Sequence, residues 1–72
     1  MIRNEDSFTV RVFKIKPWHI EKATAAMNYS IDHFISKVIH VEYIDENYFV
    51  TVKSTFDYPC VTNEWIKFGV EV

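Results

Sequence analysis

The chain has 72 residues, of which 49% are hydrophobic and 25% are charged, and a formal net charge of −2. These values predict one small globular domain spanning residues 1–72, and they exclude a disordered tail or a low-complexity linker. No apolar run is long enough to cross a bilayer, and the opening residues MIRNEDSF lack the apolar core of a signal peptide. The single cysteine, Cys60, cannot form an internal disulfide. We therefore expect a cytoplasmic protein.

The first predicted element is a β-strand over residues 7–16. Apolar and polar residues alternate in its first half, so that Val10 and Val12 share the face that we expect to meet a helix. Phe13 and Ile15 fall on the other face. This change indicates either a β-bulge or a strand with apolar side chains on both faces.

The second predicted element is a single amphipathic helix over residues 18–38. Pro17 suits the first turn of such a helix, and neither Gly nor Pro interrupts the segment. Apolar residues recur at helical spacing along its whole length. The residues in this stripe are Ile20, Ala23, Met27, Ile31, Phe34, Ile35 and Val38. The pattern predicts one helix lying on one apolar surface.

Residues 39–55 predict a β-hairpin. A loop of two or four residues centred on Glu46 and Asn47 would pair Val41 with Val52 and would leave the faces matched. A three-residue loop would mix apolar and polar side chains on both faces. We therefore expect the loop with an even number of residues, and Asn47 as the residue that accepts a positive φ.

The last part of the chain predicts a connection over residues 55–64, where Pro59 disfavours a central strand, and then a fourth strand over residues 65–72. A short helix that starts near Asn63 is the competing interpretation. The predicted fold class is therefore α+β, in the order β-α-β-β(-β). One amphipathic helix would pack on one face of a three- or four-stranded mixed sheet.

The opposite face of this sheet would have no cover within the chain. Exposed apolar patches larger than about a few hundred Å² are uncommon on monomers and usually mark interfaces, so we expect the face to bind another protein. The alternatives are that a shifted strand register places some of its residues in the core, or that the C-terminal segment folds over them. The predicted interface residues are Phe13, Ile15, Ile44, Phe49 and Trp65.

Sequence patterns for catalysis or cofactor binding are weak. The only glycine, Gly69, cannot form a glycine-rich phosphate loop, and no histidine lies near Cys60 in the sequence. No metal-binding motif occurs, and the Asp45-Glu46 pair is more typical of a solvated hairpin tip than of a cation site. We therefore predict no enzyme activity, no cofactor and no metal.

The expected function is that of a non-enzymatic protein-interaction module, such as a small inhibitor or adaptor. We expect it to form a homodimer through the open sheet face. The alternative is a single-stranded nucleic-acid-binding protein that stacks bases on aromatic side chains of the sheet. The negative net charge disfavours nucleic acid as a partner. The residues predicted to contact a partner are Arg11, Asp45, Glu46, Lys53 and Lys67.

Overall fold

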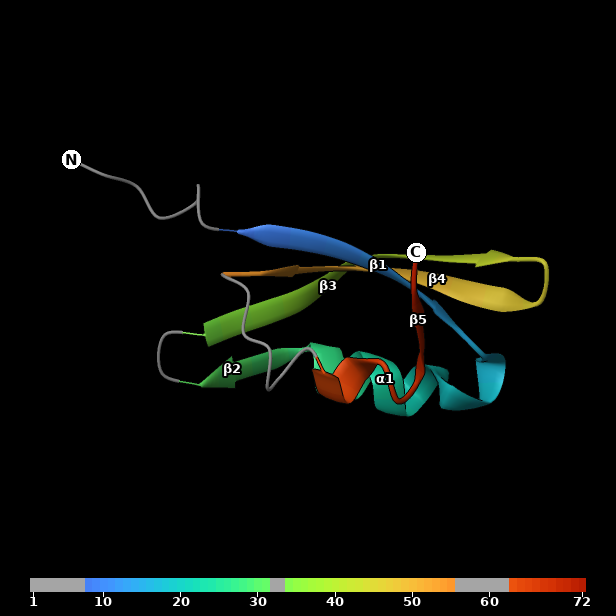
Figure 1. Cartoon of the computed structure of the whole chain (residues 1–72), viewed down its shortest axis with the longest axis horizontal. Coiled ribbons are helices and arrows are strands. Elements are labelled where there is room, and N and C mark those ends of the chain that lie inside the picture. Colours follow the sequence, from blue (N-terminus) through green and yellow to red (C-terminus); the bar gives the residue numbers. More distant parts are fainter. Residues whose placement is uncertain (1–7, 32–33, 56–62) are drawn as a thin grey trace.

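The computed structural model describes residues 8–31, 34–55 and 63–72. The described part forms one five-stranded sheet in the order β2-β3-β4-β1-β5, and every pairing in it is antiparallel. A helical layer lies on one side of this sheet (Figure 1). The elements are β1 (Thr9–Ile15), the 3₁₀ helix η2 (Pro17–His19), α1 (Ile20–Met27), β2 (Tyr29–Ile31), β3 (Phe34–Ile44), β4 (Asn47–Ser54) and β5 (Gly69–Glu71). None of the described helices is long and apolar enough to span a membrane.

The predicted fold class is wrong in its sheet and in its helix. The sheet has five strands and is wholly antiparallel, where we expected three or four strands in a mixed sheet. The predicted helix over residues 18–38 ends at Met27, because Asn28 has an extended backbone with φ −89° and ψ 94°. The Oδ1 atom of Asn28 accepts a hydrogen bond from the backbone N–H of Val38 at 2.9 Å. This contact joins the end of α1 directly to β3.

The second half of the predicted helix forms β2 and the start of β3 instead. β-Branched residues such as Ile31, Ile35 and Val38 suit a strand as well as a stripe on a helix. Phe34 and Ser36 of β3 are buried, whereas Ile35, between them, remains exposed. This alternation has the two-residue period of a strand, so pairing across the sheet overrides the helical spacing.

β1 matches the predicted strand in position but presents the opposite face to the core. Its pairing with β4 aligns Phe13 with Val50 and Ile15 with Tyr48, on the side that carries α1. Val10 therefore lies on the other side of the sheet, where it is exposed. The apolar residues in the second half of β1 thus belong to the core, as the alternative of a shifted register allowed.

The β3–β4 hairpin is present, with a turn one residue earlier than predicted. Asp45 and Glu46 form a two-residue turn with φ values of 53° and 66°. Val41 therefore pairs with Val50, where we expected Val52. The shift in pairing is two residues, so each side chain keeps its predicted face. An irregularity between Val38 and His40 inserts one extra residue into β3.

The C-terminal segment contains both of the structures that the sequence left open. Residues 63–65 are helical, and β5 then pairs with the end of β1. A Cβ atom at Gly69 would lie 2.0 Å from the carbonyl oxygen of Lys14, so only glycine allows this close pairing. The core lies between this segment, α1 and the sheet. Its buried apolar residues are Phe13, Ile15, Ala23, Met27, Phe34, Val50, Val52 and Trp65.

Candidate functional site

Three of the five predicted interface residues lie in the core, so their placement on the open sheet face is wrong. Phe13, Ile15 and Trp65 are buried, and the rings of Phe13 and Trp65 meet edge to face at 5.8 Å. The other two, Ile44 and Phe49, lie on the face away from α1, where Ile44 is exposed and Phe49 is half-buried. The outer face is therefore less apolar than the sequence predicted.

Two of the predicted partner contacts form ion pairs within the chain. Arg11 contacts Glu71 of β5 at 2.9 Å, on the core side of the sheet. Lys67 contacts Glu64 at 2.8 Å, at the exposed end of the C-terminal helical segment. These pairs attach the C-terminal segment to itself and to β1, and neither lies on the outer sheet face.

The remaining predicted contacts lie on the outer face and at the hairpin tip. The Nζ atom of Lys53 lies 4.3 Å from the centre of the Phe8 ring, a cation–π contact at the β1 end of the outer face. Asp45 and Glu46 form the exposed turn between β3 and β4. The predicted contacts are therefore distributed over several surfaces and form no single cluster.

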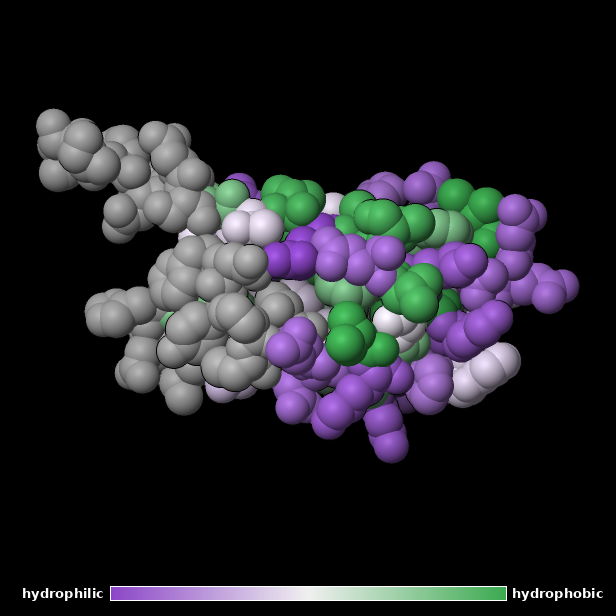
Figure 2. Space-filling model, viewed as in Figure 1, coloured by the Kyte–Doolittle hydropathy of each residue, from purple (hydrophilic) through white to green (hydrophobic). Residues whose placement is uncertain are grey.

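The outer face is mixed in character, with lysines beside apolar side chains. Strand pairing places its central residues in three rows, which are Val10–Lys53–Lys37, Val12–Thr51–His40 and Lys14–Phe49–Glu42. Two lysines therefore lie directly opposite one another, an arrangement that destabilises a sheet unless an anion is near. Figure 2 shows hydrophobic residues at the surface along the sheet layer, whereas hydrophilic residues dominate the layer of α1.

The edge of β3 is the longest open edge in the described part of the sheet. β2 pairs only with residues 34–36, and the Asn28 side chain occupies the backbone N–H of Val38. No described strand pairs with the same edge over residues 39–44. Along this segment Ile39, Val41 and Tyr43 are 51%, 43% and 58% exposed. Within the described residues, this edge is therefore both unpaired and apolar.

Backbone groups of β3 point toward this edge at alternate residues. Hydrogen-bonded and non-hydrogen-bonded pairs alternate along an antiparallel ladder, and the pair that closes a two-residue turn is hydrogen-bonded. Ile44 closes the turn, so the backbone groups of Glu42 and His40 also face β4. The N–H and C=O groups of Val41 and Tyr43 consequently face away from β4, where they are available to another strand.

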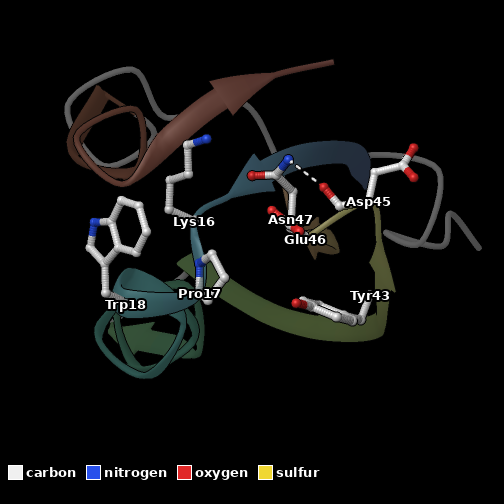
Figure 3. A pocket seen from close by; sticks show the side chains of 7 residues that line it. All are labelled: Lys16, Pro17, Trp18, Tyr43, Asp45, Glu46 and Asn47. Carbon is white, nitrogen blue, oxygen red and sulfur yellow. Dashed lines mark hydrogen bonds between the residues drawn. The ribbon is translucent and has the colours of Figure 1, made fainter.

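A shallow hollow of about 470 Å³ lies between the hairpin tip and η2 (Figure 3). Trp18 is 73% exposed at one side of it, and Tyr43 lies across from Trp18. The Asn47 side-chain amide donates to the backbone oxygen of Asp45 at 3.2 Å, which holds the turn over the hollow. The lining residues are Lys16, Pro17, Trp18, Tyr43, Asp45, Glu46 and Asn47. This hollow adjoins the open edge at Tyr43.

The described residues contain no group of three His, Cys, Asp or Glu side chains that could hold a metal ion. A His–carboxylate contact joins His40 Nε2 and Glu42 Oε1 at 3.6 Å, on the exposed surface of β3. Cys60 lies outside the described residues.

Comparison with protein families, curated proteins and solved structures finds no match for the chain.

Sequence reasoning missed the open edge and the exposed tryptophan. It placed Val41 and Tyr43 under a long helix, and they do lie on the α1 side of the sheet. However, the eight residues of α1 extend only about 12 Å, whereas the eleven residues of β3 extend about 37 Å. The distal part of β3 is therefore beyond the reach of α1. The sequence pattern predicted a helix over residues 18–38, which would have been long enough to cover this part of β3, and so it hid the mismatch.

Proposed function

We propose that the protein is a non-enzymatic interaction module that adds an extended segment of a partner protein to the open edge of β3. The observation that carries this proposal is the unpaired segment over residues 39–44, with exposed apolar side chains and outward backbone groups. In strand addition, main-chain hydrogen bonds supply affinity and alternate side chains supply specificity. Such a module would act as a small inhibitor or adaptor of a larger partner.

The open edge has only two of the features by which edge strands avoid pairing, the charged side chain of Glu42 and a bulge near Ile39. Natural edges carry lysine or proline or are very short, but residues 39–44 include neither residue type. The bulge near Ile39 twists only the start of the segment. Five of the twelve exposed large hydrophobic side chains among the described residues lie on β3, so this strand concentrates the apolar surface. An edge of this kind supports a role in binding.

The Val41→Pro variant tests the proposal. Proline removes the N–H of Val41, which faces the open edge, and should leave the ladder with β4 intact. Short linear peptides selected on the immobilised wild-type protein should shift the amide signals of residues 39–44 in NMR spectra. Binding of the same peptides should fall at least tenfold in the Val41→Pro variant.

The control is Glu42→Pro, which removes an N–H that faces β4 and should destabilise the fold by about 3 kcal/mol. Unchanged peptide binding by a folded Val41→Pro variant would refute strand addition at this edge. Selected peptides that shift only signals of the outer face would also refute it.

The outer face supports the second candidate, single-stranded nucleic-acid binding. Lys37 and Lys53 are direct cross-strand neighbours. On the same face, Lys14 lies directly opposite Phe49. This arrangement supplies cations for phosphates and an aromatic ring for stacking a base. Oligonucleotide binding that weakens steeply with salt, and that weakens further in Lys37→Gln, would favour this function. Binding that is absent or insensitive to salt would exclude it.

A further inference from the structure

We infer that the strand added to β3 is the β3 strand of a second copy of this chain, in antiparallel orientation with Val41 opposite Val41. This inference rests on the proposed strand addition and names its partner. It would join the two five-stranded sheets into one continuous sheet with a two-fold axis at Val41.

The faces of the strand restrict the registers that self-pairing allows. Directly opposite residues of an antiparallel pair share a face, so each residue must meet one an even number of positions away. Val41 and Tyr43 carry the outward backbone groups, and a two-fold pairing centred on Val41 lets each copy of that residue exchange both hydrogen bonds with its mate. This centre also brings Ile39, the residue at the bulge, to the position opposite Tyr43, and both side chains are apolar and exposed.

Charge selects the Val41 centre among the registers that remain. With Val41 opposite itself, His40 of each copy lies opposite Glu42 of the other, and it can donate a hydrogen bond to that carboxylate. A centre at Glu42 would place the two carboxylates directly opposite, which is unfavourable. A centre at His40 would set the two histidines opposite and would align Glu42 with Val38, which the irregularity at Ile39 places on the other face of the sheet, so Glu42 would gain no polar partner. Only the Val41 register satisfies both polar residues.

His40 and Glu42 are well placed to contact each other across the interface between two copies. Both side chains are about 60% exposed in the chain, at 61% and 59%, and their mutual contact is a long one of 3.6 Å. Their backbone groups face β4, so across the new interface they form a non-hydrogen-bonded pair, the type with the closest side chains. The two-fold axis supplies this pair twice.

The inference can be tested by exchanging the residues at positions 40 and 42. Sedimentation velocity over a wide range of protein concentration measures the self-association of each variant. His40→Glu would place two carboxylates opposite one another at two positions, so self-association should weaken on the order of tenfold. The double variant His40→Glu/Glu42→His should restore it, because the exchange keeps unlike partners opposite in this register. Circular dichroism checks that both variants remain folded. A double variant no stronger than His40→Glu would overturn the register.

Isotope-filtered NMR on a mixture of labelled and unlabelled wild-type protein reads the register directly. The inferred pairing predicts an intermolecular contact between the Hα atoms of His40 and Glu42. A wild type that stays monomeric at its highest soluble concentration would overturn the inference. In that case peptide binding that is lost in Val41→Pro would still support strand addition by a foreign partner. A dimer without this contact would overturn the inference as well.

Discussion

The turn between β3 and β4 places two residues with side chains in the left-handed region of φ. Asp tolerates this region moderately well, whereas Glu, with φ 66°, occupies the position where such turns normally have glycine. We predict that Glu46→Gly stabilises the protein by about 0.5–1 kcal/mol, because relief of left-handed strain exceeds the entropy that glycine loses on folding. Urea unfolding at a concentration where the protein is monomeric measures this change.

Glu46→Ala is the matched control, since it removes the same carboxylate and keeps the Cβ atom. It should give little or no stabilisation. Equal stabilisation by Ala and Gly would show that the carboxylate, and not the backbone conformation, is the source of the effect. Tyr43 and Asn47, which flank this turn, both line the hollow between the hairpin tip and η2.

At the scale of elements, the start of β3 distinguishes a strand from the helix that the sequence predicted. Phe34 is 2% exposed and Ile35 is 49% exposed, although both belonged to the predicted helical stripe. We predict that Phe34→Ala destabilises the fold by about 3–5 kcal/mol, through loss of buried apolar contacts. Ile35→Ala should cost less than about 1 kcal/mol. Chemical denaturation of both variants measures the difference, and similar large costs for both would contradict the strand.

Some elements could be predicted from the sequence because local alternation of apolar and polar residues marks a strand whatever it pairs with. β1 and the β3–β4 hairpin were predicted, and the face of each hairpin residue is confirmed. The helix was predicted too long, because β-branched residues after Asn28 satisfy a helical spacing by coincidence. Val38, for example, pairs instead with Val52 of β4, which lies far along the chain. No local window contains that information.

The candidate site was only partly predictable for the same reason. Asp45 and Glu46 were expected at the hairpin tip, and Ile44 and Phe49 on the outer face, and the structure has them there. Phe13, Ile15 and Trp65 were misplaced because the face that a strand buries depends on which side receives the helix. The open edge of β3 could not be predicted at all, since it results from the short reach of β2 and α1.

At the scale of the whole molecule, self-association through β3 would link folding stability to protein concentration. If folded chains pair and unfolded chains do not, each tenfold rise in concentration above the dissociation constant adds about 0.7 kcal/mol per chain, which is half of the usual 1.4 kcal/mol per tenfold. For a domain of this size we predict that the midpoint of thermal unfolding rises by about 3–5 °C for each tenfold rise in protein concentration.

Val41→Pro should unfold at a midpoint that does not depend on concentration, because its edge cannot complete the two central hydrogen bonds. Calorimetry on both proteins over the same concentration series measures the two slopes. Equal slopes would mean that any dimer forms through another surface, and the outer face with Phe49 would then be the next surface to test.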